Sequence, residues 1–567
     1  MMFDTIIVGG GSAGSVLAHR LSAQSSHKVL LCEAGPDAPP GEEAKEIRDS
    51  YPGTAYFDPR FHWTELRVHT QIVSHNNPQE RPPLRKYEQA RVLGGGSSIN
   101  GQMANRGAPT DYDEWEARGA TGWNWDAVLP YFKKVEHDLD FDGPYHGKEG
   151  RIKVRRIKPE YWNNHAKAAA KSFADAGFKP LEDQNGFFED GHFPITISNA
   201  EEQRVSAAMG YLDRATRARG NLTISCETQV KHLLFEDQRC VGVVAMVRGQ
   251  EQRFMGKEII LSCGAIHSPA HLLRSGIGPV GHLRDLGIPV RMALPGVGKG
   301  LMDHPSIALS SFLKRGARVD NQTRRHILLG LRYSSKLQGI PPGDMFAAVV
   351  SKSAWHAVGE QIASMLLWVN KTYSETGQLR LASADWRAEP VVEFNLLSDR
   401  RDLDRLMSGF RMMAAIQMSG ELGKITADHF PASYSDRVRK LGVVSDKNKF
   451  LTNMISMILD GPAFIRSYFI NRFVVEGFRM DQVLTDDAAL EAFIRKATIG
   501  VWHASCSCRM GRTEDPMSVV DINGRVMGIE GLRVVDASIF PVVPCANTNF
   551  PTLMTAEKIA DAIIAGH

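Results

Sequence analysis

Two continuous apolar runs, separated by a glycine-rich stretch and a mixed segment, mark the first forty residues. The first run covers residues 5–8, and the second covers 29–32 and ends at a glutamate. Between them, apolar residues recur at 13, 16, 17 and 21, which is the period of a helix. Continuous apolar runs are typical of strands that are covered on both faces, as in a parallel sheet. The pattern predicts a strand, a helix and a second strand.

Three glycines stand between the first strand and the helix, in GxGxxG spacing. Gly9 would allow a tight turn, Gly11 would let the backbone approach a pyrophosphate, and Gly14 would let the helix lie close to the sheet. The helix N-terminus would face the phosphates with free N–H groups. Glu33, at the end of the second strand, is placed to accept a hydrogen bond from a ribose hydroxyl. This unit predicts a dinucleotide site.

The identity of the dinucleotide stays open at this point, because no second GxGxxG follows. Enzymes that pass electrons from NAD(P)H to a flavin usually need two such sites. A chain with one site either binds NAD and acts on its substrate directly, or binds FAD and takes electrons from the substrate.

Composition narrows the class of partner. Of 567 residues, 43% are hydrophobic and 23% are charged, as in ordinary globular proteins, and the net charge is +3. So small a net charge predicts no surface for nucleic acid or an acidic membrane, and it favours a small-molecule partner. No uninterrupted apolar run reaches the length of a membrane span, and the N-terminus shows no secretory signal.

The seven cysteines are scattered, with no CxxC pair and no histidine at metal-ligand spacing. This pattern predicts reduced thiols, a cytoplasmic location and no metal site.

Several longer segments resemble those of a known family. Residues 90–113 read ARVLGGGSSINGQMANRGAPTDYD, and residues 264–278 read GAIHSPAHLLRSGIG. They resemble the two signatures of the glucose-methanol-choline (GMC) oxidoreductases, FAD enzymes that oxidise alcohols. His271 departs from the second signature, where the family has an aliphatic residue. Further similar segments follow in the family's order: PGVGKGLMDHP at 295–305, WHASCSCRMG at 502–511, VVDASIFP at 534–541 and ANTNFPTLMTAEKIAD at 546–561.

Within the family, the sequence most resembles bacterial oxidases of 5-hydroxymethylfurfural and aromatic alcohols. The shared segments are GGGSSIN, VWHAS and ANTNxPTLM. The chain departs from these oxidases in a longer region between about residues 432 and 477, and at Cys506 and Ser507, where the family typically has Gly-Thr. The apolar, helical-looking insert at 453–478 could be a lid, a dimer contact or a core hairpin, and the first two are favoured.

The resemblance implies an α/β fold with two interleaved domains. A discontinuous Rossmann-like FAD-binding domain is expected at 1–155, 201–305 and 499–567. A substrate-binding domain on a mostly antiparallel sheet is expected at 156–200 and 306–498.

The resemblance also implies the chemistry of a primary alcohol oxidised to the aldehyde by hydride transfer to flavin N5. Such a step needs a base for the hydroxyl proton and a group that holds the oxygen. His503 matches the family's catalytic histidine and is the expected base. Asn547 matches the position of a second polar residue and is expected to bind the substrate oxygen, since an amide cannot act as the base. Val501, Trp502 and Trp368 are expected to line the substrate pocket.

The position of the histidine that links FAD covalently in some family members is occupied by Ile99, so we expect FAD to be bound non-covalently. The residues expected at FAD are Gly9, Gly11, Ser12, Ala13, Gly14, Glu33, Ala34, Arg91, Leu93, Gly95, Gly96, Ser97, Asn100, Gly101, Val230, Trp502, Asp536, Ala537, Asn547 and Thr548.

Other functions remain as alternatives: a choline-type or aliphatic alcohol dehydrogenase of the same family, a hydroxynitrile lyase on the same fold, and an NAD-dependent dehydrogenase. The sequence leaves open which alcohol is oxidised, whether O₂ or another acceptor reoxidises the flavin, and whether the chain forms a homodimer.

Overall fold

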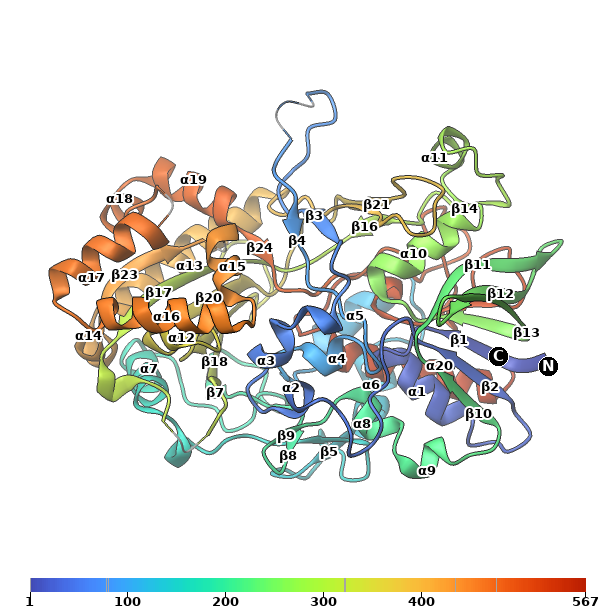
Figure 1. The fold of residues 1–567 in the computed structure, drawn as a ribbon, viewed down its shortest axis with the longest axis horizontal. Helices are drawn as coiled ribbons and strands as arrows, with labels where there is room; N and C mark the ends of the chain where they lie inside the picture. The colour runs from blue at the N-terminus through green and yellow to red at the C-terminus, as the bar shows by residue number, and fades with distance from the viewer. Residues whose placement is uncertain (1, 78, 80, 321–322, 434, 476) are drawn as a thin grey trace.

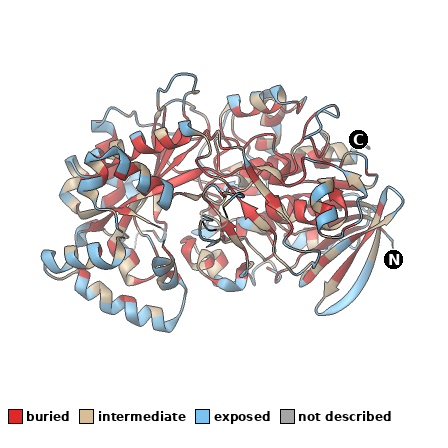
Figure 2. Cartoon of the chain, turned by 90° about the horizontal axis from the view of Figure 1, so that it is seen from above, coloured by how far each residue is buried: buried red, intermediate tan, exposed pale blue. Residues whose placement is uncertain are grey.

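Two seven-stranded sheets form the two ends of the molecule, with both chain termini at the end that carries β1 (Figure 1). The computed structural model describes residues 2–77, 79, 81–320, 323–433, 435–475 and 477–567. Buried residues concentrate in the two sheets, whereas many helices at the left end are exposed (Figure 2).

The first sheet contains the predicted strand–helix–strand unit. β1 (Met2–Val8) leads through the glycine turn into α1 (Ser12–Leu21), and β2 (Val29–Cys32) pairs with β1 in parallel, which confirms the prediction. The strand order is β10-β2-β1-β13-β12-β11, with β25 paired to β13. The remaining strands are β10 (Leu222–Ser225), β11 (Thr228–Glu236), β12 (Arg239–Val247), β13 (Gln250–Leu261) and β25 (Leu532–Val534).

Helices from both ends of the chain pack beside this sheet. α1 contacts α20 (Asn549–Ile564), and α20 contacts α6 (Trp125–Val135). Apart from Met2 at the start of β1, the apolar side chains of α1, β1 and β2 are almost fully buried, which fits a parallel sheet covered on both faces. The C-terminal helix thus brings the residues that precede it next to the N-terminal glycine turn.

The second sheet is antiparallel throughout, with the order β23-β17-β20-β19-β18-β7 and with β24 paired to β17. α13 (Arg400–Gln417) packs against β17 and β20. The strands are β7 (Gly191–Pro194), β17 (Pro305–Leu313), β18 (Ile327–Tyr333), β19 (Met345–Val350), β20 (Ile362–Val369), β23 (Thr426–Ala432) and β24 (Ile499–Gly500).

A five-stranded sheet joins parts of the chain that we expect in different domains. Its order is β16-β21-β22-β3-β4. The exact domain boundaries therefore stay a prediction. The strands are β3 (Arg67–His69), β4 (Arg85–Lys86), β16 (Lys299–Leu301), β21 (Gly377–Arg380) and β22 (Val391–Glu393).

The insert is helical, as its pattern predicts, but its helices begin earlier than residue 453. It consists of α15 (Asp436–Gly442), α16 (Asp446–Leu459), α17 (Ala463–Phe469) and the π-helical turn η5 (Ile470–Val474). No helix in the described part of the chain combines the length and apolar character needed to cross a membrane. All seven cysteines are free thiols, as expected.

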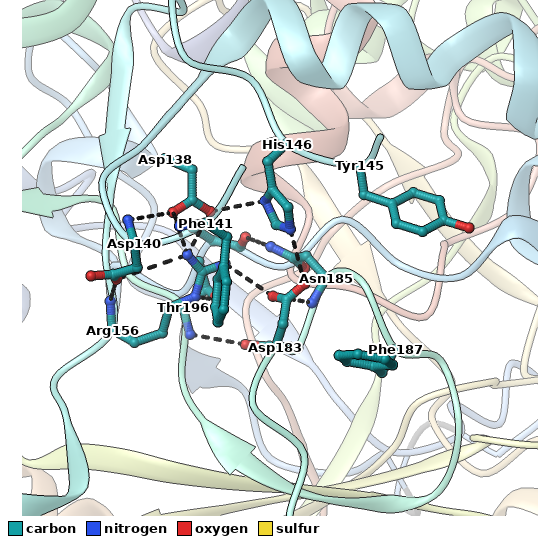
Figure 3. A network of polar contacts seen from close by, with 12 residues as sticks. Asp138, Asp140, Phe141, Tyr145, His146, Arg156, Asp183, Asn185, Phe187 and Thr196 are labelled. Atoms are coloured by element: carbon teal, nitrogen blue, oxygen red, sulfur yellow. Dashed lines mark hydrogen bonds and ion pairs between the residues drawn. The ribbon is translucent and has the colours of Figure 1, made fainter. Parts of the chain in front are cut away.

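A buried ion network joins β5 (Glu136–Asp138) to the segment that leads to the second sheet (Figure 3). His146 lies between two carboxylates, with Nδ1 2.9 Å from Asp138 Oδ2 and Nε2 2.9 Å from Asp183 Oδ2. Arg156 contacts the same two carboxylates. Burial alone would lower the pKa of His146, but hydrogen bonds to Asp138, Asp183 and Glu136 raise it to about 10. The protonated imidazole therefore holds these segments together.

Candidate active site

One cavity brings together motifs from the two ends and the middle of the chain. Its walls include the first glycine turn, residues 95–96 and 99–101, residues 262–265, residues 501–504 and residues 547–549. The turn and residues 262–265 directly follow β1 and β13, so the cavity lies at the carboxyl ends of parallel strands, where cofactors bind in open α/β sheets.

The glycines at this cavity leave no room for side chains except toward its interior. A Cβ on Gly9, whose φ is +103°, would lie 2.4 Å from the Ser262 carbonyl oxygen, and one on Gly14 would lie 1.9 Å from the Gly9 carbonyl oxygen. A Cβ on Gly95 would lie 2.6 Å from Gly11 Cα. A Cβ on Gly11, by contrast, would have no neighbouring atom closer than 3.8 Å. The two glycine loops thus form a backbone cradle suited to a pyrophosphate.

Two buried carboxylates hold the loops of this cradle. Glu33 accepts hydrogen bonds from the backbone N–H groups of Gly10 (2.9 Å) and Gly35 (2.8 Å). Asp536 accepts from the N–H of Gly264 (2.9 Å) and from the Ser268 hydroxyl (2.6 Å). Burial raises the pKa of both carboxyls, and the backbone donors offset part of that rise.

His503 and Asn547 meet at the cavity, although 43 residues separate them in the sequence. The Asn547 amide Nδ2 donates to His503 Nε2 at 2.9 Å. Asn547 Oδ1 is buried and has no hydrogen-bond partner among the described residues. An unpartnered buried acceptor beside a histidine fits a site that a ligand completes.

A second histidine lies behind the first. His304 Nδ1 is 2.8 Å from His503 Nδ1, and both side chains are buried. Burial lowers the pKa of His503 well below its usual value, and the neighbouring His304 lowers it further. Burial also lowers the pKa of His304 to about 3. Both imidazoles are therefore neutral at neutral pH and share one proton between their Nδ1 atoms.

The proton between the two rings determines the tautomer of His503. Since Asn547 donates to Nε2, that nitrogen is unprotonated and Nδ1 carries the proton, which it donates to His304. Asp303 fixes the backbone at this place by accepting from the N–H groups of His503 (3.0 Å) and Val501 (3.1 Å). The basic nitrogen of His503 is thus the one at the cavity.

An aromatic wall with a carboxylate behind it closes another side of the cavity. Glu88 Oε2 accepts from Trp502 Nε1 and from the Tyr56 hydroxyl, both at 3.0 Å, and Oε1 pairs with Arg439 of α15. The rings of Tyr56 and Trp502 meet edge to face with centroids 5.3 Å apart. Trp502 has a φ of +61°, which is rare for a residue with a large side chain. Glu88 therefore positions the residue that precedes His503.

Most residues expected at the cofactor and substrate line this one cavity. The exceptions among the expected FAD residues are Gly14, Arg91, Leu93 and Ser97, which are not part of the lining. The lining residues are Gly9, Gly11, Ser12, Ala13, Glu33, Ala34, Gly95, Gly96, Asn100, Gly101, Val230, Val501, Trp502, His503, Asp536, Ala537, Asn547 and Thr548.

Trp368 does not line the cavity, contrary to the expectation. It lies on β20, as its alternating pattern predicts, but its side chain is buried and stacks on Phe346 with ring centroids 4.4 Å apart. Phe346 of β19 stands opposite Trp368 in the antiparallel pairing, so the two rings pack against each other within the sheet. The alternation of β20 could not indicate this cross-strand partner.

The sequence motifs assign no role to four residues of the site: Tyr56, Glu88, His304 and Asp303. His304 and Asp303 belong to the DHP segment at 303–305, which resembles a recurring segment of the family. The distance along the chain from this segment to His503 does not predict that they are in contact. Glu88 stands two residues before the first signature, which is the only signal for it.

Two groups of side chains in the described part of the chain bring potential metal ligands together: Asp303 with His304 and His503, and Glu136 with Asp138 and His146. Hydrogen bonds and ion pairs within the protein already engage these groups. The absence of a metal site stays a prediction.

Comparison with known proteins agrees with this geometry. Residues 3–306 and 372–556 match the two family models described as GMC oxidoreductase. The chain is 43% identical to the 5-(hydroxymethyl)furfural oxidase of Methylovorus sp. (strain MP688), over 99% of both chains. It is 33% identical to the mitochondrial choline dehydrogenase of Homo sapiens, over 99% of this chain and 89% of that one. The crystal structure of pyridoxine 4-oxidase from Mesorbium loti superposes with a TM-score of 0.80 and 24% identity, covering all of both chains.

Proposed function

The chain belongs to the GMC oxidoreductase family, and from that premise we propose that it oxidises an aromatic or furanic primary alcohol to the aldehyde, with His503 as the base. The observation that carries this proposal is the neutral His503, whose unprotonated Nε2 stands at the cavity beside Asn547.

FAD is the cofactor of this family, and the residues at the cavity fit it. The glycine cradle would hold the pyrophosphate, Glu33 would face the ribose, and Asn547 Oδ1 would accept a hydrogen bond from the ligand. When it is bound, FAD supplies the two-electron acceptor for oxidation of the alcohol carbon.

His503 and Asn547 exchange partners when the alcohol enters. The hydroxyl of the substrate donates to His503 Nε2 in place of the Asn547 amide, and the amide N–H that is released donates to the substrate oxygen. His503 then accepts the hydroxyl proton at Nε2 while Nδ1–H remains bonded to His304. Because burial disfavours the imidazolium, His503 stays available as a base well below neutral pH.

The wall formed by Tyr56 and Trp502 supports an aromatic or furanic substrate. Flat rings pack well against aromatic side chains in edge-to-face or offset arrangements. The 43% identical relative is named for oxidation of a furan alcohol, which agrees with this choice. The name of that relative also supports O₂ as the acceptor that reoxidises the flavin.

Anaerobic mixing of the purified flavoprotein with a panel of alcohols tests the proposal. We expect 5-hydroxymethylfurfural and benzyl alcohol to bleach the visible flavin band faster than choline or an aliphatic alcohol does. Faster bleaching by choline would instead support the choline dehydrogenase function that the 33% identical relative suggests. An unchanged spectrum with every alcohol would exclude oxidation and favour the lyase alternative. Re-admitting air, with and without an added quinone, identifies the acceptor.

We also infer that FAD is bound without a covalent link. Ile99 lines the cavity at the position where a histidine would form one, and its side chain has no nucleophilic nitrogen. Heat or acid should release all of the flavin into the supernatant, and flavin that remains with the precipitated protein would contradict this. A cytoplasmic location stays a prediction from the scattered thiols.

A further inference from the structure

The insert exposes an unusual amount of apolar surface. Half of the large apolar side chains that are exposed in the described part of the chain lie between residues 438 and 473. The most exposed are Phe464 (74%), Phe450 (70%), Tyr468 (67%) and Met457 (63%). We call these four residues, together with Met454, the apolar face of the insert. Monomeric proteins rarely leave so many large apolar side chains together in water without a binding role.

The apolar face is a different side of the insert from the side that packs against the rest of the protein. On α16, Phe450, Met454 and Met457 follow each other at helical spacing and are exposed, whereas Thr452 and Leu459 on the opposite side are buried. On α17, Phe464 and Tyr468 are four residues apart and so share one side of the helix. Both helices lie at the left end of the molecule in Figure 1. Leu459 and Ile470 of the insert pack against Phe312 and Phe430 of the second sheet, whereas the residues of the apolar face stay exposed.

Unpaired cations accompany this face. Lys440, Lys447, Lys449 and Arg472 are exposed, and none makes an ion pair with any residue that the structure describes. The acidic Asp460, by contrast, is neutralised by Arg318. The net charge of the whole chain hides this concentration of positive charge, which is why composition alone predicts no acidic partner.

We propose that the apolar face of the insert docks onto an anionic phospholipid surface, with α16 and α17 lying in the plane of the interface. Aromatic and other large apolar side chains enter the boundary of the acyl chains, and lysines and arginines attract acidic headgroups. A second copy of the chain would place the same positive charges against each other, which disfavours a symmetric dimer through this face. A lid is disfavoured because the exposed side chains face away from the body of the protein.

Flotation of the purified holoenzyme with large unilamellar vesicles tests the docking. Vesicles of phosphatidylcholine alone are compared with vesicles that contain about one third phosphatidylglycerol. We expect binding that needs phosphatidylglycerol and weakens at high salt. The variant Phe464→Ser/Tyr468→Ser should lose binding, and Lys447→Gln/Lys449→Gln should weaken it about thirtyfold. The matched control Tyr161→Ser/Phe187→Ser removes two aromatic side chains that are 55% and 50% exposed elsewhere and should bind like the wild type.

Two further measurements keep the test decisive. Flavin content and oxidation of a water-soluble alcohol should be unchanged in every variant, because none of these residues touches the cavity. Failure of the wild type to float with anionic vesicles would overturn the proposal, as would equal loss of binding in the control variant. A solution mass of two chains that Phe464→Ser/Tyr468→Ser reduces to one would overturn it in favour of a dimer contact.

Discussion

Replacing His304 by leucine tests how the second histidine controls the first. In the wild type, His304 Nδ1 accepts a hydrogen bond of 2.8 Å from the Nδ1–H of His503, and this bond keeps Nε2 unprotonated for the substrate. Leucine is apolar and cannot accept a hydrogen bond. The bond from His503 to residue 304 is therefore lost, while the site stays buried. His304→Gln is the matched control, since its amide oxygen can still accept a hydrogen bond.

The size of the effect follows from the hydrogen bond that is lost. A bond between neutral groups contributes about 1 kcal/mol, which corresponds to about a fivefold change in the ratio of the two His503 tautomers. A buried N–H left without a partner adds a further penalty of about 1 kcal/mol or more. We therefore expect kcat/KM to fall by roughly five- to thirtyfold in His304→Leu and by less than about threefold in His304→Gln.

The pH profile gives a second readout. Burial is the main cause that lowers the pKa of His503, and His304 lowers it further. In the leucine variant burial still lowers the pKa of His503 and only the smaller contribution of His304 is removed, so the pKa should rise slightly but stay below its usual value, and the acid limb of kcat/KM should move slightly to higher pH. Steady-state rates from pH 4 to 9 on a benzylic alcohol, with flavin content measured in parallel, provide the assay. A leucine variant with the rate and pH profile of the wild type would refute the role of His304.

Two further changes test the supporting structure. Glu88→Gln weakens the bonds to Trp502, Tyr56 and Arg439. It should lower the unfolding free energy by about 2 kcal/mol and kcat/KM by roughly tenfold, whereas the exposed control Glu65→Gln should do neither. A Glu88→Gln variant with the activity and stability of the wild type would show that Glu88 does not position Trp502. His146→Gln breaks the buried network of Figure 3 and should lower the unfolding free energy by about 3–5 kcal/mol near pH 6. Because the pKa of His146 is raised to about 10 from its usual 6.5, its contribution is complete below about pH 6.5 and is lost as the pH rises through about 10. Chemical denaturation at pH 6 and pH 10 should therefore show a smaller difference between variant and wild type at pH 10, and an equal difference at both would contradict the protonated network.

The elements that the sequence predicts best are those with a local pattern. The strand, turn and helix around Gly9 and Gly11 follow from apolar runs and glycine spacing, and the structure shows the same elements in the same order. The two seven-stranded sheets agree with the fold that the family resemblance implies. Most expected cofactor residues line one cavity because their motifs end strands or begin helices of the same sheet.

The parts that the sequence could not predict depend on contacts between distant segments. Glu88 and Arg439 are far apart in the chain, and only the folded molecule shows that they meet behind Trp502. The sequence predicts Trp368 at the substrate, but its ring instead stacks on Phe346, which faces it on the neighbouring strand. The insert shows the same limit, since its pattern predicts helices but not which side of α16 stays exposed.

Reduction of the flavin in His503→Ala tests the central claim most directly. Removing a general base lowers the rate of a proton-coupled step by about 10²- to 10⁴-fold. In anaerobic single-turnover experiments with 5-hydroxymethylfurfural, we expect the bleaching of the flavin in this variant to slow by that factor, with the spectrum of the bound flavin unchanged beforehand. Bleaching at the rate of the wild type would contradict the assignment of His503 as the base.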